Sequence, residues 1–471
     1  MIEADVPSLS PESFKPLLGT RSWRRFTESL SLGRSALEGR TLWHLSSTVT
    51  GGGVAELLAS VLGYLKGAEV SSRWIAIDGS HDFFVVTKRL HHMLHGKEGD
   101  GGPLGGAERR RYEECLFGQL PDIAALLQPG DVVVLHDPQV AGLAPALRDA
   151  GATLVWNCHI GSDDVNDLTQ RAWSFLMPFI SACDAVVFSC ARHVWRNLDG
   201  VRVAIVPPCI DAFSPKNAPL GARQVKAILA ATGIVPGGGG GEPMYTRRDG
   251  TPARITWTAD VIEEAPVPPT APIVSQVSRW DPLKDHAGVA ATFAQDITLS
   301  SDAHLVLAGP SPQEVTDDPE GSATLAELKR CWADLPSHAR CRVHIACLPM
   351  ADVEENAVIV NALQRRSQVV VQKSLAEGFG LTVAEALWKE RPTVASAVGG
   401  ITEQITDGEN GVLVDSPDDH SGFAKAIAAL LEDPDLSRRL GHKGKTTVKE
   451  RFLAPAYLGA YLPLVASLVK E

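Results

Sequence analysis

Short apolar runs alternate with amphipathic stretches along nearly the whole chain, a pattern typical of parallel βαβ units. The runs fall into two groups of similar size, so we predict an α/β fold with two sheets, each flanked by helices. The expected strands of the first group are 41–46, 73–77, 131–135, 153–158, 184–189 and 201–206, with helices near 54–66, 142–149 and 166–182. The expected strands of the second group are 272–277, 303–308, 341–346, 368–372, 392–396 and 411–414, with helices near 285–294, 322–335, 354–366 and 381–388.

Residues 233–270 interrupt this rhythm. They contain five consecutive glycines (237–241), mixed charges and a PVPPT run. Gly and Pro at this density interrupt both helices and strands, so we predict an insertion or linker. We therefore divide the chain into an N-terminal extension, a first domain, the insertion, a second domain and a C-terminal helix that packs back on the first domain. The expected boundaries are 1–40, 41–232, 233–270, 271–451 and 452–471.

The composition is that of an ordinary soluble globular protein. Hydrophobic residues make up 44% of the 471 residues and charged residues 21%, which excludes wholesale disorder. Subtracting 56 Asp and Glu from 44 Lys and Arg leaves a net charge of −12, which argues against nucleic acid as a partner. No window approaches 18 consecutive apolar residues, so we expect no membrane span.

The amino terminus and the cysteines indicate the cellular compartment. The first residues, MIEADVPSLSPESF, lack the basic-then-apolar pattern of an export signal. The eight cysteines contain no CxxC pair and lie mostly in apolar, strand-like runs. We therefore expect reduced, buried thiols in a cytoplasmic protein, with neither a zinc site nor a disulfide framework.

Three segments follow predicted strands at positions where α/β sheets bind ligands. The first is the loop with Gly51, Gly52 and Gly53, after strand 41–46. A glycine loop between a strand and a helix lets backbone N–H groups approach an anion, and the helix start adds partial positive charge. The loop is neither a GxGxxG fingerprint nor a P-loop, so a tight turn without a ligand is the alternative.

The second segment, SRWDPLKD (278–285), follows strand 272–277 and contains two cations, Arg279 and Lys284. The guanidinium fork of arginine and the point charge of lysine suit a diphosphate. The alternative is a pair of solvated surface cations that flank a turn.

The third segment, EGFGLTVAE (377–385), is the most specific of the three. It follows strand 368–372 and opens a helix, with seven residues between Glu377 and Glu385. Gly378 and Gly380 let the backbone turn and present amides of the helix start to an anion. We therefore give the two carboxylates different tasks: one reaches a sugar hydroxyl or a developing positive charge, and the other binds vicinal hydroxyls.

Two histidines end predicted strands of the first group. His159 follows strand 153–158, and His136, with Asp137 and Gln139 after it, follows strand 131–135, so we expect these side chains to line one crevice. Hydrogen-bonded structural histidines are the alternative. The sequence contains no HExxH motif, acidic metal cluster or GxSxG elbow, which argues against a metal site and an α/β-hydrolase.

With these segments in view, the chain resembles the retaining glycosyltransferases of family 4, whose hallmark is two carboxylates separated by seven residues, here Glu377 and Glu385. The resemblance is closer still to the trehalose glycosyltransferring synthases and the related trehalose phosphorylases. It covers about 41–232 and 271–451, most of the chain. The motifs that carry it are WHLSST (43–48), GGGVAE (51–56), FFVVTK (83–88), HDPQ (136–139), CHI (158–160), PPCID (207–211), 276–284, NALQR (361–365), 372–388, GGI (399–401) and DG (407–408).

This resemblance implies a GT-B fold, in which two Rossmann-like domains face each other across a cleft that holds the active site. The first domain would bind the acceptor, and the second would bind a nucleotide-diphosphate glucose. Such enzymes need no divalent metal, because cations and helix amino termini neutralise the leaving diphosphate. The resemblance therefore implies no cofactor beyond the sugar co-substrate.

The family's donor site is carried over to this chain residue by residue. Arg279 and Lys284 would bind the diphosphate. Glu377 would contact the transferred glucose, and Glu385 the ribose hydroxyls. The other implied donor contacts are backbone amides around Phe379, Gly380 and Leu381, and the loop with Gly52 and Gly53, which closes the cleft.

On the acceptor side, the resemblance implies His136, Asp137, Gln139 and His159. His159 would also touch the transferred sugar, through its ring or its backbone carbonyl, and it joins Glu377, Arg279 and Lys284 in the implied catalytic set. Retention in this family is usually explained by front-face attack, in which the departing phosphate accepts the acceptor's proton. The protein then supplies orientation and electrostatic stabilisation.

The resulting expectation is a retaining glucosyltransferase that joins nucleotide-activated glucose to free glucose and gives trehalose. The alternatives are a trehalose phosphorylase that uses glucose 1-phosphate, a related transferase with another acceptor, and a non-catalytic nucleotide-sugar sensor. The chain departs from the family pattern in its acidic GSDD loop (161–164), its long 233–270 insertion and its first forty residues, which carry no usable motif. The donor nucleotide and the oligomeric state, a homodimer included, stay open.

Overall fold

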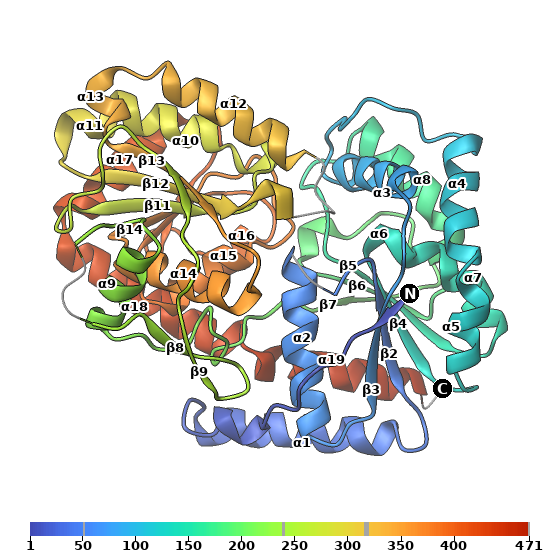
Figure 1. Cartoon of the computed structure of the whole chain (residues 1–471). Helices are drawn as coiled ribbons and strands as arrows, with labels where there is room; N and C mark the ends of the chain where they lie inside the picture. The colour runs from blue at the N-terminus through green and yellow to red at the C-terminus, as the bar shows by residue number, and fades with distance from the viewer. Residues whose placement is uncertain (50–51, 238–240, 315–319, 470–471) are drawn as a thin grey trace. The chain divides into compact units, whose positions relative to one another are not determined.

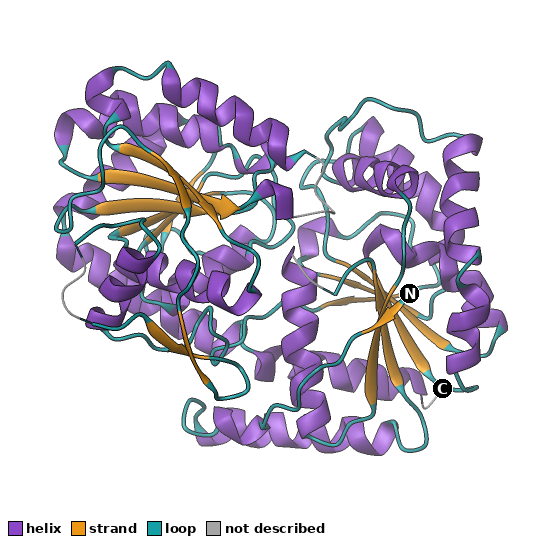
Figure 2. Cartoon of the chain, in the orientation of Figure 1, coloured by secondary structure: helices purple, strands orange, loops and turns teal. Residues whose placement is uncertain are grey.

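Two seven-stranded sheets organise the chain in the computed structural model, which describes residues 1–49, 52–237, 241–314 and 320–469. Each sheet has helices on both faces (Figure 1, Figure 2) and belongs to a separate compact unit. The first unit comprises Met1–Ile210, Glu377–Phe379 and Arg451–Glu471, and the second comprises Asp211–Ala376 and Gly380–Glu450. The predicted α/β class with two Rossmann-like sheets is confirmed.

The sheet of the first unit has the strand order β1-β3-β2-β4-β5-β6-β7. All neighbouring strands are parallel except β1, which pairs antiparallel with β3. The order turns back between β2 and β4, and loops at the carboxyl ends of such strands are where open α/β sheets bind ligands. The strands are β1 (Ile2–Glu3), β2 (Leu42–Ser46), β3 (Ser72–Ala76), β4 (Val132–His136), β5 (Thr153–Cys158), β6 (Ala185–Phe188) and β7 (Arg202–Ile205).

Apolar side chains cover both faces of this sheet. Trp43 and Leu45 of β2 pack with the buried residues of α3, α4, α7 and α8, whereas α1, α2 and α19 pack with one another. Asn166 begins α8, because its side chain accepts hydrogen bonds from the first backbone N–H groups of the helix. The helices are α1 (Thr20–Ala36), α2 (Gly52–Gly67), α3 (His81–Leu94), α4 (Gly106–Phe117), α5 (Leu120–Leu126), α6 (Asp137–Val140), α7 (Ala144–Asp149), α8 (Asp167–Ile180) and α19 (Ala454–Val469), with 3₁₀ turns at Pro11–Phe14, Ala141–Leu143 and Ala191–His193.

The sheet of the second unit has the strand order β10-β13-β12-β11-β14-β15-β16. Apart from the antiparallel edge strand β10, this is the order of a doubly wound dinucleotide-binding sheet, with its switch point between β11 and β14. The strands are β10 (Asp260–Ile262), β11 (Ile273–Val277), β12 (His304–Pro310), β13 (Val343–Leu348), β14 (Val369–Gln372), β15 (Thr393–Ser396) and β16 (Val412–Val414).

Two apolar clusters cover the faces of the second sheet. One joins it to α10, α12 and α17, and the other joins it to α9 and α14. The helical elements are α9 (Ala222–Ala231), η4 (Pro282–Lys284), α10 (His286–Thr292), the π-helical turn η5 (Phe293–Ile297), α11 (Thr298–Ser300), η6 (Pro312–Glu314), α12 (Gly321–Ala333), α13 (Ser337–Arg340), α14 (Val353–Arg366), α15 (Leu381–Trp388), α16 (Ile401–Gln404), α17 (His420–Glu432) and α18 (Pro434–Arg451).

The structure differs from the sequence-based expectation in the region around 233–270. The predicted linker contains a small hairpin, β8 (Met244–Thr246) with β9 (Pro252–Arg254), as well as β10. The unit boundary falls at 210/211 instead of 232, because α9 packs on α14 of the second sheet. Strands of three residues have too little periodicity to be read from sequence, and tertiary contacts supply their stability.

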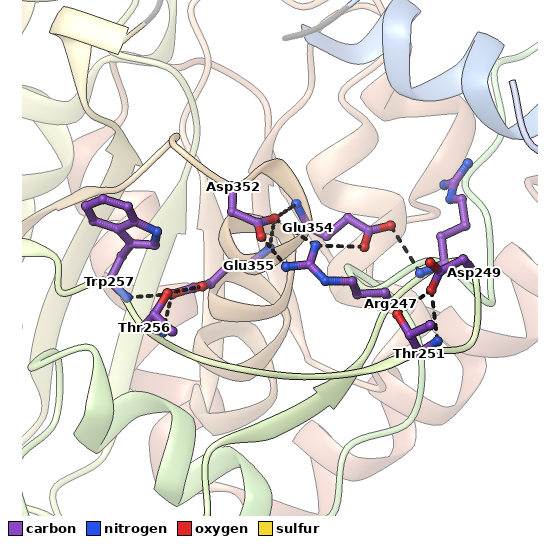
Figure 3. A network of polar contacts seen from close by, with 9 residues as sticks. Arg247, Asp249, Thr251, Thr256, Trp257, Asp352, Glu354 and Glu355 are labelled. Carbon is purple, nitrogen blue, oxygen red and sulfur yellow. Dashed lines mark hydrogen bonds and ion pairs between the residues drawn. The ribbon is translucent and has the colours of Figure 1, made fainter. Parts of the chain in front are cut away.

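The hairpin of β8 and β9 is fixed to the amino end of α14 by charged side chains (Figure 3). Arg247 pairs with Asp352, the N-cap of α14, and its Nη1 lies 3.3 Å from Glu354 Oε2. The carboxylate of Glu355 accepts hydrogen bonds from the backbone N–H groups of Thr256 and Trp257, both at 2.7 Å. The described residues of the insertion are therefore part of the second unit.

None of the helices that the structure describes has the length and the apolar character needed to cross a lipid bilayer.

Candidate functional site

Three predicted residues meet at the carboxyl ends of β4 and β5 in the first unit. Nδ1 of His136 lies 3.1 Å from Nε2 of His159. The backbone N–H of His159 donates to Oδ1 of Asp137 at 2.7 Å, and the indole N–H of Trp156 donates to the Asp137 carbonyl at 3.0 Å. Asp137 has a φ of +61°, a conformation that is costly outside glycine and that these two hydrogen bonds hold in place.

Burial sets the charge of this cluster. It lowers the pKa of His159 to about 4 and the pKa of His136 well below its ordinary value, so both rings are neutral at pH 7. Burial also raises the pKa of Asp137 to about 7, so this carboxyl exchanges its proton near neutral pH. The two histidines are consequently uncharged hydrogen-bonding groups, which suit a polar neutral ligand, whereas Asp137 is partly charged at pH 7.

The loop Glu377–Phe379 belongs to the first unit, although the chain on both sides of it belongs to the second. A Cβ added to Gly378 would lie 2.2 Å from the carbonyl oxygen of His159, so only glycine permits this approach. Phe379 is buried and packs edge-on against Phe452, with ring centroids 5.4 Å apart. Glu377 therefore lies on a loop that is pressed against the backbone of His159.

For the other predicted residues of the first unit, the structure gives positions and exposure but no contact that indicates a role. Gln139 is partly exposed on α6, two residues after Asp137. Gly52, with a φ of +80°, begins α2, and Gly53 follows it in the exposed first turn. Gly51, the first glycine of the predicted loop, lies outside the described residues.

In the second unit, Arg279 and Lys284 lie on the loop that follows β11, as predicted from the order of the elements. Asp281 organises this loop: its carboxylate accepts from the N–H of Leu283 at 2.8 Å, and its carbonyl accepts from the N–H of Lys284 at 2.9 Å. Nη2 of Arg279 is 3.9 Å from Oδ2 of Asp281. About a third of the Arg279 side chain is exposed, so the guanidinium is restrained but accessible.

Hydrogen bonds join the loops on both sides of the second switch point. Gln276, at the end of β11, donates from its amide to the Lys284 carbonyl at 2.7 Å and accepts from the N–H of Lys373 at 2.9 Å. The N–H of Leu375 donates to the carbonyl of Leu283 at 2.8 Å. The loop with the two predicted cations is thus tied to the loop that leads toward Glu377.

The helix that follows this loop begins as predicted. Gly380 is the N-cap of α15 with a φ of +83°, and its carbonyl accepts from the Gln404 amide at 3.2 Å. Leu381 is the first residue of the helix. Glu385 is only 2% exposed, and its Oε1 lies 3.7 Å from Nζ of Lys216. Glu385 is therefore a buried carboxylate beside a cation and does not lie on the solvated face of the helix.

Sequence reasoning assigned no role to three further polar groups. His44 of β2 is buried, with Nδ1 2.9 Å from Nε2 of His136. Lys373 is 1% exposed at the end of β14 and pairs with Asp285, and Lys216 pairs with Glu385. A charged or titratable residue inside an apolar strand, as in LWHLS or VVVQK, is the signal that was available for two of them.

No group of three or more His, Cys, Asp or Glu side chains that could hold a metal ion occurs within the described residues.

Comparison with known proteins identifies two sequence families in the chain. Residues 44–195 match the family described as "Trehalose synthase, N-terminal domain", and residues 259–447 match "Glycosyl transferases group 1". The chain is 31% identical to a trehalose synthase of Pyrococcus horikoshii over 97% of its own length and 96% of the relative. It is 25% identical to a trehalose phosphorylase of Pleurotus pulmonarius over 89% of its length, but it covers only 56% of that protein.

Solved structures show the same fold at lower sequence identity. An alpha,alpha-trehalose 6-phosphate synthase from Burkholderia multivorans aligns with a TM-score of 0.65 and 17% identity, over 92% of this chain and 99% of that one.

Proposed function

The chain belongs to the trehalose synthase family of glycosyltransferases with the GT-B fold, and we propose that it is a retaining glucosyltransferase that moves glucose from a nucleotide-diphosphate glucose to free glucose, forming trehalose.

One observation supports the proposed donor site most directly. The side chain of Gln276 forms hydrogen bonds with both the loop after β11 and the loop after β14 in the second unit. These loops border the switch point of a sheet with dinucleotide-binding strand order, where such sheets bind nucleotides. In the proposal, Arg279 and Lys284 hold the diphosphate. The buried Glu385 binds the ribose hydroxyls, and the start of α15, from Phe379 through Gly380 to Leu381, presents its amides to the phosphates.

The proposed sugar contacts come from the first unit. Glu377 contacts the transferred glucose beside His159, whose carbonyl the Gly378 backbone approaches closely. Asp137, His136 and Gln139 bind the acceptor. Because His159 is neutral, its ring offers a hydrogen bond to a sugar hydroxyl without a charge that water would solvate better.

The proposed reaction proceeds on one face of the donor sugar. The bond between the anomeric carbon and the phosphate oxygen breaks, and the acceptor hydroxyl oxygen forms the new bond on the same face, which retains the configuration. The leaving phosphate takes the hydroxyl proton, so the products are trehalose and a nucleoside diphosphate. Arg279 and Lys284 stabilise the charge that develops on the leaving group.

Trehalose phosphorolysis is the second candidate function, because the chain is similar to a trehalose phosphorylase over most of its length. The two reactions differ in the leaving group, which is a nucleoside diphosphate in the first and inorganic phosphate in the synthetic direction of the second. The lower identity and the partial coverage of that relative favour the first reaction.

A donor screen tests the proposal. The protein is incubated with 1-¹³C-glucose and, in separate reactions, with UDP-, ADP- or GDP-glucose or α-glucose 1-phosphate, and the products are identified by ¹³C NMR. We expect labelled α,α-trehalose and an equal amount of nucleoside diphosphate from at least one nucleotide sugar. Trehalose from glucose 1-phosphate alone would establish the phosphorylase instead. Tight nucleotide-sugar binding without turnover toward any simple sugar would indicate a sensor and contradict the proposal.

A further inference from the structure

Three histidines form a hydrogen-bonded chain across neighbouring strands of the first sheet. Nδ1 of His44 lies 2.9 Å from Nε2 of His136, and Nδ1 of His136 lies 3.1 Å from Nε2 of His159. The rings are nearly parallel, with interplanar angles of 21° and 11°. The hydrogen bonds therefore connect buried His44 of β2 to His159, which the proposed function places at the sugar.

All three rings are neutral near pH 7. Burial lowers the pKa of His44 to about 3 and that of His159 to about 4, and burial together with the two neighbouring rings lowers the pKa of His136 well below its ordinary value. A neutral imidazole has one N–H donor and one acceptor nitrogen. Both hydrogen bonds of His136 must then point the same way along the chain, which leaves two possible directions.

The buried end of the chain selects between these directions. Nε2 of His44 is buried and has no hydrogen-bond partner among the residues that the structure describes. If the protons point from His159 toward His44, this nitrogen carries an unpaired N–H. If they point from His44 toward His159, it carries only an unpaired acceptor lone pair. Unpaired N–H groups are the rarer of the two in protein interiors, so the second direction is favoured.

The other end of the hydrogen-bonded chain is the ring of His159. Nε2 of His159 is occupied by His136, and Nδ1 makes no hydrogen bond within the described part of the chain. Nδ1 is consequently the ring nitrogen that remains for a sugar. In the favoured direction, Nε2 of His159 accepts a hydrogen bond from the Nδ1–H of His136, so the proton of His159 resides on Nδ1.

We propose that His44 is a positioning residue, which donates to His136 and through it fixes His159 as an Nδ1–H donor toward a sugar hydroxyl oxygen. This proposal rests on the proposed function only for the identity of the ligand. It also means that His159 cannot act as a base at Nδ1. A ring nitrogen that already carries a proton cannot take the proton of an acceptor hydroxyl. His159 then binds and orients the sugar, and the leaving phosphate remains the base.

A second pair of hydrogen-bonded histidines, elsewhere in the polypeptide, serves as an internal reference. Nδ1 of His304 lies 2.9 Å from Nε2 of His344, and Nδ1 of His344 lies 2.9 Å from a carboxylate oxygen of Glu263. An ionised carboxylate only accepts, so His344 carries its proton on Nδ1. This pair has a known direction and belongs to the second unit.

The test begins with the substrate-free protein. Protein labelled with ¹⁵N-histidine is studied by long-range ¹H–¹⁵N NMR at pH 7.5, where protonated and unprotonated ring nitrogens differ in shift, and signals are assigned by their loss in single variants. We expect His159 and His344 both to carry the proton on Nδ1. In His44→Phe, the ring signals of His136 and His159 should move while those of His344 stay. In the matched control His304→Phe, the reverse should hold.

Kinetics then test the consequence for the reaction. We expect His44→Phe to lower kcat ~10-fold with little change in the KM for the nucleotide sugar, because an interaction in the transition state is lost. His44→Asn, which keeps an N–H donor near the position of Nδ1, should recover most of kcat, and His304→Phe should leave kcat unchanged.

Each other outcome overturns the proposal. A proton on Nε2 of His159 would show that the hydrogen bonds run from His159 toward His44. Unmoved His159 signals in His44→Phe would show that His44 does not influence His159. Moved signals with an unchanged kcat remove the positioning role but leave the proposed function intact. If no sugar donor supports transfer, the proposed function fails, and the NMR spectra of the wild type and His44→Asn still decide the direction of the chain.

Discussion

The buried ammonium of Lys373 pairs with the carboxylate of Asp285 and joins the end of β14 to the start of α10. The backbone of Asp285 has a left-handed conformation, with a φ of +45°. Its carboxylate also caps α10 by accepting a hydrogen bond from the N–H of Gly288 at 3.0 Å. Lys284 directly precedes it in the chain. The ion pair therefore helps to hold the left-handed backbone of Asp285, directly after a proposed diphosphate-binding residue.

We expect Lys373→Met to lower the free energy of unfolding by about 2 kcal/mol, because it removes one partner of a largely buried pair. Urea unfolding of this variant, of Asp285→Asn and of the double variant measures the coupling. The exposed pair of Arg438 with Asp435 supplies the control, since Arg438→Met should change stability by less than ~0.5 kcal/mol. Additive losses for Lys373 and Asp285 would contradict the role of the pair.

Glu377→Gln should lower kcat about 100-fold and leave the affinity for the nucleotide nearly unchanged, because the proposed contact is to the reacting sugar. Lys284→Ala should instead weaken nucleotide binding and turnover together. Isothermal titration with the nucleoside diphosphate and steady-state kinetics separate the two effects. Glu432→Gln, at an exposed position on α17, is the control that should behave as the wild type. Unchanged turnover in Glu377→Gln would place that carboxylate away from the reaction.

Gly378→Ala should lower kcat about 100-fold, because its Cβ would lie 2.2 Å from the His159 carbonyl and must displace one of the two backbones. Gly459→Ala is the matched control: its Cβ would meet nothing within 4 Å on helix α19, so a gain of about 0.5–1 kcal/mol in stability is expected. Kinetics and thermal unfolding of both variants test this. A Gly378→Ala variant with wild-type activity would mean that the close approach has no part in the reaction.

The neutral buried histidines predict that acid destabilises the protein. An unfolded histidine takes up a proton below its ordinary pKa of 6.5, whereas the buried ones stay neutral until the pKa of the folded state, so stability falls as the pH drops from 6.5. Asp137, whose pKa burial raises to about 7, acts in the opposite direction, and so does His193, whose pKa the nearby Asp163 carboxylate raises to about 9 against the effect of burial. Besides His136, burial lowers the pKa values of four histidines strongly: His44, His286 and His344 to about 3, and His159 to about 4.

Each of the four histidines contributes about 1.4 kcal/mol per pH unit below pH 6.5, and Asp137 and His193 offset about half of the sum between pH 7.5 and 5.5. We therefore expect the free energy of unfolding to fall by on the order of 3 kcal/mol between pH 7.5 and 5.5. Urea unfolding at a series of pH values measures this slope. A constant stability across the range would show that these histidines titrate normally in the folded protein.

The elements that border the proposed site were predictable, because each is a local pattern. The predicted strands 41–46, 153–158 and 368–372 match β2, β5 and β14 within one residue, and the predicted helix 381–388 is α15. Long apolar runs and glycine loops carry this information without any tertiary contact.

The relations between distant residues were not predictable in the same way. The His44–His136 hydrogen bond joins residues 92 positions apart, and the Lys373–Asp285 pair joins residues 88 apart. Both depend on strand order, which a single sequence does not reveal. The loop Glu377–Phe379, which the structure places with the first unit, depends likewise on a close backbone approach that a glycine in the sequence only permits.

The antiparallel strand β10 bears on how the second half of the chain can be cut out and purified. A fragment that starts at residue 271, the boundary that the sequence suggests, would lose β10 and expose the backbone of β13, whose side chains are all buried in the intact chain. Bare strand edges recruit other chains, so we expect this fragment to aggregate. A fragment that starts at residue 211 keeps β10 and the hairpin and should elute as a single species on size-exclusion chromatography. Equal solution behaviour of the two fragments would show that the glycine-rich insertion does not shield the sheet.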